Sequence, residues 1–185
     1  MKLKKTKIPD LFILSPDKYL DNRGLFFEDF KTSNDFNFVF HQQNISVSSI
    51  GVLRGLHLQL ENSQSKIISV LNGSIYDVVV DLRKNSKNFG DWFSIILSDT
   101  NLQQLHVPKG FAHGFLALED NTRVIYKVDD EYNPNSEITI KWDDPDLNIV
   151  WPTRPKLISE KDMQGISFKD FKGMNYSFDN EVIWF

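Results

Sequence analysis

The chain has 185 residues, of which 41% are hydrophobic and 25% charged, a composition typical of a soluble globular protein. Its formal net charge of −4 at pH 7 argues against a nucleic-acid-binding protein, because that partner would be a polyanion. The absence of cysteine excludes disulfides, thiolate nucleophiles and cysteine-ligated metals. We expect one cytoplasmic domain over residues 1–185, since no signal peptide and no apolar stretch of about 20 residues suggests contact with a membrane.

Strand signals dominate the chain, and helix signals are few. Short helices are predicted only near the start, at 15–22 and 33–38. Strand-like runs separated by turn clusters follow in order at 24–30, 39–53, 66–71, 74–82, 92–97, 105–107, 113–118, 122–128 and 137–142. Many short strands at such spacing predict a β-sandwich or barrel. The aromatic segment after Asp162 has no regular pattern, and we expect it to pack on a sheet edge or on a partner.

Asn72 and Gly73 stand between two apolar runs and predict a two-residue hairpin turn. In the second run, 74–82, strand alternation puts Asp77 and Asp81 on the same face. Two carboxylates therefore interrupt an otherwise apolar face.

The segment Arg54-Gly55-Leu56-His57 contains His57, whose imidazole titrates near neutral pH, close to Arg54, whose guanidinium stays charged. Taken singly, His57 is more often a hydrogen-bonded structural residue, and Arg54 a surface charge. A regular strand would point these two side chains to opposite faces, because they are three positions apart. A pocket that uses both therefore requires an irregularity at Gly55.

Other candidates are equally ambiguous when taken one at a time. His113, next to Gly114, fits a core histidine that bonds a carbonyl, Tyr126 fits an amphipathic packing residue, and Asp162 fits a solvated loop. A metal-binding cupin barrel typically shows His-x-His with a nearby glutamate and a later histidine. No second histidine stands next to His57, so we predict no metal site.

Further motifs join the one around His57, in the segments 21–28, 42–46, 54–59, 64–66, 77–83, 89–92, 108–115, 126–127, 132–134, 142–145, 151–152 and 158–162. In this order, over about residues 5–165, they resemble the dTDP-4-dehydrorhamnose 3,5-epimerases, which are cupin-type nucleotide-sugar epimerases. The resemblance implies an all-β, cupin-like jelly roll (a double-stranded β-helix) with a few short helices, which forms a homodimer.

The resemblance also implies a reaction. The substrate would be dTDP-4-dehydro-6-deoxy-D-glucose, and inversion at C3 and C5 would give dTDP-4-dehydro-L-rhamnose, most commonly a precursor for surface polysaccharide. The C4 ketone acidifies the hydrogens on C3 and C5, so a base can remove one and leave an enolate. Reprotonation on the opposite face then inverts the centre. No cofactor is expected, because the reaction needs neither a metal nor a redox group.

Four residues match the family's catalytic positions. By resemblance, His57 is the base, Asp162 fixes its tautomer, and Tyr126 is the acid on the opposite face. Lys66 would place its ammonium near the C4 oxygen, where negative charge develops.

Eight further residues match substrate-binding positions. Arg54 would pair with the diphosphate, Gln42 and Asn44 would bond the nucleotide or sugar, and His113 would lie below the sugar. Tyr132 would also contact the substrate. Arg23, Phe26 and Glu28 match residues that reach into the neighbouring subunit's site, with Phe26 near the base.

The chain departs from the family pattern at Gln43, Ile45, Leu58 and Glu131, the last standing where many members carry an aromatic residue. Several alternatives therefore stay open. They are an epimerase that inverts only C3 or C5, one acting on another nucleotide-linked 4-keto sugar, a 3,4-ketoisomerase, a non-catalytic sugar-binding jelly roll and a metal-dependent oxygenase.

Overall fold

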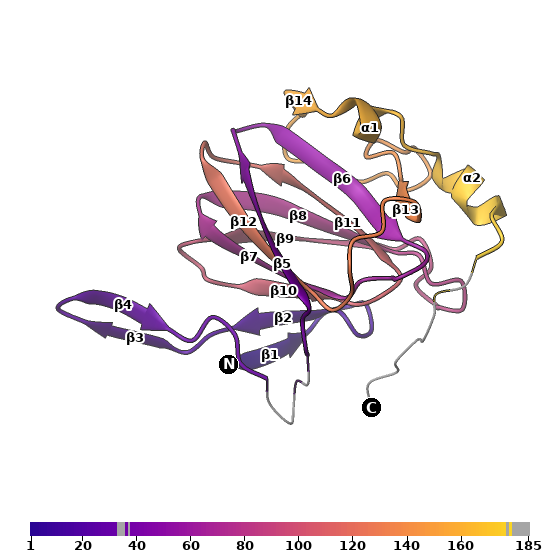
Figure 1. Ribbon diagram of the computed structural model, residues 1–185. Coiled ribbons are helices and arrows are strands. Elements are labelled where there is room, and N and C mark those ends of the chain that lie inside the picture. The colour runs from indigo at the N-terminus through magenta and orange to yellow at the C-terminus, as the bar shows by residue number, and fades with distance from the viewer. Residues whose placement is uncertain (33–35, 37, 177, 179–185) are drawn as a thin grey trace.

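Two β-sheets face each other in the computed structural model, which describes residues 1–32, 36, 38–176 and 178 (Figure 1). The first sheet has the order β1 (Lys2–Lys5), β2 (Phe12–Ser15), β10 (Gln104–Val107), β7 (Lys66–Asn72), β12 (Thr122–Val128) and β5 (Gln42–Ser48). The second has the order β13 (Glu137–Thr139), β6 (Val52–Gln59), β11 (Phe111–Ala117), β8 (Ser74–Asp81) and β9 (Trp92–Ser98), and the short β14 (Leu157–Ile158) pairs with β6. This arrangement confirms the predicted all-β fold.

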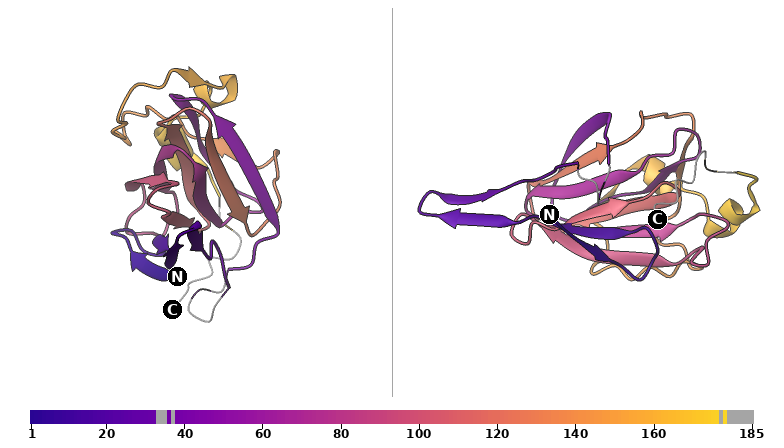
Figure 2. Two further views of the ribbon diagram at one scale, coloured as in Figure 1. Left: turned by 90° about the vertical axis from the view of Figure 1, so that its left-hand side faces the viewer. Right: turned by 90° about the horizontal axis from the view of Figure 1, so that it is seen from below.

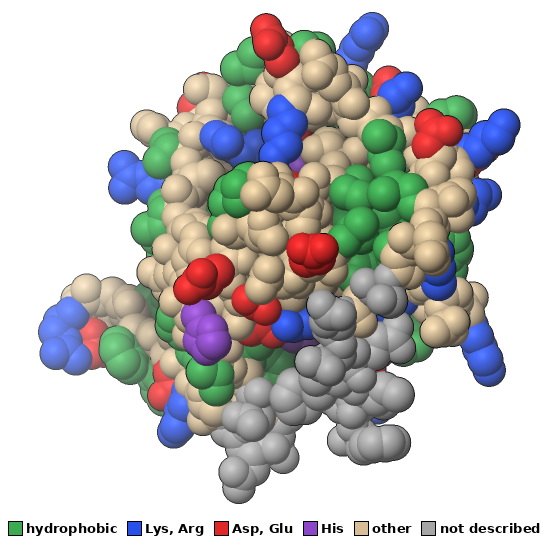
Figure 3. All heavy atoms as spheres, turned by 45° about the vertical axis from the view of Figure 1, so that its right-hand side comes forward, with side chains coloured by type: hydrophobic (Ala, Val, Ile, Leu, Met, Phe, Trp, Pro, Cys, Tyr) green, Lys and Arg blue, Asp and Glu red, His purple; other side chains and the backbone are tan. Residues whose placement is uncertain are grey.

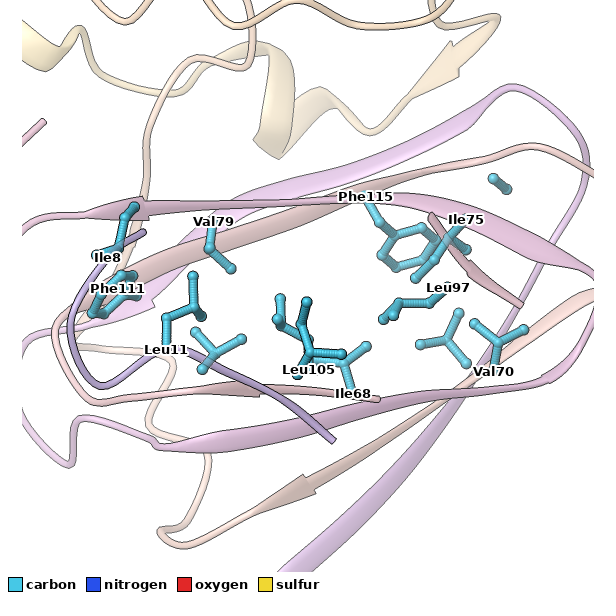
Figure 4. Packing of buried hydrophobic residues seen from close by; sticks show 14 residues of the cluster. Ile8, Leu11, Ile68, Val70, Ile75, Val79, Leu97, Leu105, Phe111 and Phe115 are labelled. Carbon is cyan, nitrogen blue, oxygen red and sulfur yellow. The ribbon is translucent and has the colours of Figure 1, made fainter. Parts of the chain in front are cut away.

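The main hydrophobic core lies between the two sheets. Figure 4 shows Ile75, Val79 and Phe115 of the second sheet facing Ile68, Val70 and Leu105 of the first. Burial of a large apolar side chain contributes about 1.5–3 kcal/mol. This packing holds the sheets at a fixed spacing, on which any pocket between them depends.

A second core covers the outer face of the second sheet. Alternate strand residues such as Val78 and Val80 pack there against Phe168 and Phe171 of α2 (Phe168–Gly173). This helix and α1 (Glu160–Met163) each begin at a serine whose side chain accepts a backbone N–H. α2 lies in the segment after Asp162 that was predicted to be irregular, and α1 includes Asp162 itself, which was read as part of a solvated loop. Both predictions were wrong because helices this short show no amphipathic period. No helix in the described part of the chain is long and apolar enough to cross a membrane.

The predicted hairpin at Asn72 and Gly73 is wrong, although both strands exist. β7 pairs with β10 and β12 in the first sheet, whereas β8 pairs with β11 and β9 in the second. With both edges of each strand occupied, the turn leads the chain from one sheet to the other. Gly73 has φ +77°, a left-handed conformation that glycine adopts without strain.

The predicted helix at 15–22 is also wrong. β3 (Lys18–Asp21) pairs with β4 (Gly24–Phe27), and this β3–β4 hairpin projects from the body of the molecule (Figure 2). Its apolar side chains are exposed, with Leu20 at 79% and Phe26 at 69%. The other predicted helix, at 33–38, falls mostly on residues outside the described part of the chain.

Candidate active site

A cavity of about 550 Å³ lies between the two sheets, within the range of pockets that hold small-molecule ligands. Most of the predicted site residues line it: Asn44, Arg54, His57, Lys66, His113, Tyr126, Tyr132 and Asp162. They come from β5, β6, β7, β11, β12, the loop after β12, and α1. The structure therefore brings together side chains that are spread over more than half of the chain.

The irregularity predicted at Gly55 is present. In the pairing of β6 with β11, His57 lies opposite His113 but Arg54 lies opposite Phe115, so β6 holds one extra residue. Gly55 has φ +104°, and a Cβ there would lie 2.5 Å from the carbonyl oxygen of His113. Only glycine fits this bulge, which lets Arg54 and His57 both face the cavity.

His57 lies between two carboxylates. Its Nε2 is 2.5 Å from Oδ1 of Asp162, and its Nδ1 is 3.8 Å from Oε1 of Glu137. Burial disfavours the charged form of Asp162, but the hydrogen bond and the charge of His57 outweigh this effect and hold the pKa of Asp162 below its usual range. An ionised Asp162 fixes the Nε2–H tautomer of His57 and leaves Nδ1 as the basic nitrogen.

Glu137 was not identified from the sequence. It accepts hydrogen bonds from Lys161 and from the hydroxyl of Tyr132, the latter at 2.7 Å. Burial raises its pKa, but these hydrogen bonds and the charge of His57 lower it below the usual range. Glu137 follows a turn cluster in a predicted strand, where one acidic residue gives no chemical signal. Its position beside His57 comes only from the pairing of β13 with β6.

Two further ionisable residues line the cavity, Lys66 from β7 of the first sheet and His113 from β11 of the second. Nε2 of His113 lies 2.8 Å from Oδ2 of Asp77, which is fully buried. Burial raises the pKa of Asp77, and His113 opposes this shift. Burial also lowers the pKa of Lys66 to about 8. Asp77 is one of the two carboxylates that interrupt the apolar face of β8, and its hydrogen bond to His113 accounts for one of them.

Tyr126 reaches the cavity from the first sheet, opposite the sheet that carries His57. Its ring lies beside those of His113 and Phe115, at centroid distances of 6.3 and 6.4 Å. The phenolic oxygen is 3.0 Å from the hydroxyl of Ser46. Burial raises the pKa of Tyr126, so the phenol is neutral at physiological pH and has a proton to donate.

Arg54 lines the cavity, whereas Gln42 is not among the residues that line it. Arg54 donates to the hydroxyl of Ser48 at 3.1 Å. Gln42 lies at the rim, where it donates to Asn44 at 2.9 Å and accepts the backbone N–H of Tyr132 at 3.3 Å.

Three predicted residues, Arg23, Phe26 and Glu28, do not line this cavity. They lie on or beside the β3–β4 hairpin, which stands apart from the body of the molecule (Figure 3). Acidic and basic side chains are interspersed over the face in this view. Among the described residues, no three histidine, aspartate or glutamate side chains are grouped to hold a metal ion.

Comparison with known proteins identifies the family. A model of the dTDP-4-dehydrorhamnose 3,5-epimerase family matches residues 5–170. A dTDP-4-dehydrorhamnose 3,5-epimerase from Methanothermobacter thermautotrophicus is 46% identical over 165 residues, which cover 85% of this chain and 89% of the relative.

Comparison with solved structures also finds epimerases of nucleotide-linked sugars. A dTDP-6-deoxy-D-glucose 3,5-epimerase from Legionella pneumophila, in complex with dTDP-4-keto-L-rhamnose, superimposes with a TM-score of 0.89 at 38% identity, covering 97% of this chain and 98% of the other. A 3′-monoepimerase from Streptomyces bikiniensis, in complex with dTDP-quinovose, has a TM-score of 0.82 at 29% identity, covering 88% and 85%. By its sequence match over most of its length, the chain belongs to the dTDP-4-dehydrorhamnose 3,5-epimerase family.

Proposed function

We propose that this protein inverts C3 and C5 of dTDP-4-dehydro-6-deoxy-D-glucose and gives dTDP-4-dehydro-L-rhamnose. One observation carries the proposal. The His57–Asp162 pair and the Tyr126 phenol enter one cavity from opposite sheets, so a sugar ring between them has a base on one face and an acid on the other.

The first step is removal of a proton next to the ketone. Nδ1 of His57 takes the hydrogen from C3 or C5, and the electron pair of the broken C–H bond moves onto the C4 oxygen as an enolate. The imidazolium that forms is stabilised by ionised Asp162, at 2.5 Å from Nε2, and by Glu137 on its other side. General-base catalysis of this kind contributes about 10²–10⁴-fold.

The negative charge on the C4 oxygen needs a fixed cation. Lys66, which lines the cavity, supplies it, and His113, hydrogen-bonded to Asp77, lines the same cavity from the second sheet. In a partly desolvated site such groups stabilise the transition state more strongly than water does. Below a pH of about 8 the ammonium of Lys66 keeps its proton.

Inversion is completed from the other face. The O–H bond of Tyr126 breaks, its proton forms the new C–H bond, and the enolate electrons return to carbon. The resulting phenolate takes a proton from solvent, and His57 releases its proton to solvent. The same groups then act on the carbon at the other side of the ketone.

The cavity wall offers matching contacts for the rest of the substrate. Arg54 has a planar fork of donors for the diphosphate, and Lys161, at the rim beside Glu137, adds a second cation. Tyr132, with Gln42 and Asn44, binds the nucleoside or sugar.

We also propose that the enzyme is a homodimer. The β3–β4 hairpin projects from its own subunit and exposes Leu20 and Phe26, a surface that suits burial in a partner. In the dimer, Arg23, Phe26 and Glu28 would complete the partner's site.

We place the enzyme in the cytoplasm, where nucleoside triphosphates supply nucleotide sugars. A chain without cysteine has no disulfide that the reducing conditions there could break.

Incubation with dTDP-4-dehydro-6-deoxy-D-glucose in heavy water, read at C3 and C5 by NMR, tests the function. We expect deuterium at both carbons and a rhamnose-configured product when the matching reductase traps it. Label at one carbon only would make the protein a single-centre epimerase. Label at neither carbon would refute the proposed activity on this sugar.

A further inference from the structure

Ser46 lies in the middle of β5, at the edge of the first sheet, and lines the cavity. Its hydroxyl is 3.0 Å from the phenolic oxygen of Tyr126 on β12. Neither hydroxyl has another side-chain hydrogen bond in the part of the chain that the structure describes. Two residues further along the same face, Ser48 accepts a hydrogen bond from Arg54.

The direction of the Ser46–Tyr126 hydrogen bond decides what Tyr126 can do. A phenol has one proton, and if Tyr126 gives it to Ser46, that proton does not face the sugar. If Ser46 donates instead, the phenolic proton is free to point into the cavity. The donor is then already in place for the phenolate that remains after proton transfer.

The surroundings of Tyr126 give this donor particular weight. Burial raises the pKa of the phenol and so disfavours the phenolate, and the hydrogen bond from Ser46 and the charge of Arg54 act in the opposite sense. The rings of His113 and Phe115 limit where the phenol ring lies but do not bond its oxygen. Among described residues, Ser46 is therefore the group that orients the reacting O–H.

We propose that Ser46 is a positioning residue that turns the Tyr126 proton toward the sugar and thereby decides whether an enolate is inverted or returned to its starting configuration. The proposal rests on the proposed epimerase function. An enolate that Tyr126 fails to protonate regains a proton from His57 on the original face. The sugar then exchanges its hydrogen with solvent without inversion.

Measuring this partition tests the role. In heavy water, the ratio of deuterium in recovered, uninverted substrate to deuterium in inverted product would be compared between wild type and Ser46→Ala, Ser46→Thr and Ser46→Val. Threonine and valine are both β-branched and suit a strand, but only threonine keeps the hydroxyl. Ser69→Ala is the matched control. Ser69 lies in the same sheet on the opposite face, and its hydroxyl has no hydrogen-bond partner among the described residues.

We expect Ser46→Ala and Ser46→Val to raise this ratio about tenfold or more, as expected for loss of a hydrogen bond to a charged group. Ser46→Thr and Ser69→Ala should keep the wild-type ratio. A valine variant with an unchanged ratio, or variants that lose exchange and inversion equally, would overturn the role of Ser46. Wild-type protein that neither exchanges nor inverts would refute the epimerase function itself, which is a separate result.

Discussion

Asp162 lies with its Oδ1 2.5 Å from Nε2 of His57, although 105 positions separate the two residues along the chain. The second oxygen of this carboxylate accepts the backbone N–H of Gly55 at 3.2 Å. Asp162 therefore bonds both the imidazole and the bulge that turns it toward the cavity. The orientation of the proposed base depends on α1, a four-residue helix capped by Ser159.

Replacement of the proposed base should separate chemistry from binding. We expect His57→Ala to lower both deuterium exchange and inversion by on the order of 10²–10⁴-fold, while nucleotide binding and thermal stability stay near wild type. His41→Ala is the control, because His41 is exposed and does not line the cavity. Near-normal turnover by His57→Ala would rule out its role.

Removal of the orienting charge tests the His57–Asp162 pair. In Asp162→Asn an amide can donate to Nε2, which moves the imidazole proton to Nδ1 and blocks the nitrogen that must act as the base. We expect kcat to fall by about 10²–10⁴-fold with little change in KM. The same substitution at the exposed Asp143 should have no effect. An active Asp162→Asn enzyme would mean that His57 needs no orienting partner.

Loss of the proposed acid should affect inversion selectively. Tyr126→Phe keeps the ring against His113 and Phe115 but has no proton to donate. We expect inversion to fall by on the order of 10²-fold or more, while exchange from the His57 face continues. NMR in heavy water measures both rates in one sample. Equal losses would indicate a general positioning role for Tyr126.

The pH dependence of kcat/KM should reflect the protonation state of Lys66. Its pKa is lowered to about 8 by burial, so the ammonium is present below this pH and is lost above it. We expect kcat/KM to decline above a pH of about 8 as the cation at the enolate oxygen disappears.

Two substitutions at Lys66 check this assignment. Lys66→Arg should move the decline to higher pH, because a guanidinium stays protonated to a pH of about 12. Lys66→Met should reduce turnover at every pH, whereas Lys169→Met, an exposed change in α2, should not. An unchanged alkaline limb in Lys66→Arg would assign the decline to another group.

Mixed dimers can test whether the β3–β4 hairpin completes a neighbouring site. His57→Ala and the double variant Arg23→Ala/Glu28→Ala should each be nearly inactive alone. After unfolding and refolding together, half of the dimers would be mixed, and one of the two sites in each would have both an intact base and an intact partner hairpin. We expect about a quarter of wild-type activity to return. No recovery in dimers shown by mass to be mixed would refute a site shared between subunits.

The sequence by itself determined the all-β class and the strands between residues 66 and 128, because alternation with period two and turn residues are local signals. It did not indicate β1 or β2, and it joined β5 and the start of β6 into one strand over 39–53. It also indicated which chemical groups to seek, and it predicted a bulge at Gly55 from the three-residue spacing between Arg54 and His57. The same local reading predicted a helix at 15–22, where pairing with β4 produces a strand. It also missed α2, whose position depends on burial of Phe168 and Phe171.

Tertiary structure alone decided which strands pair and which side chains meet. Asn72-Gly73 suits a hairpin, yet β7 and β8 belong to different sheets because other strands occupy their edges. Glu137 and Ser46 carry no signal of their own in the sequence. They lie beside His57 and Tyr126 because strand pairing places them there, and contacts between residues far apart in the chain depend on the packing of the whole fold.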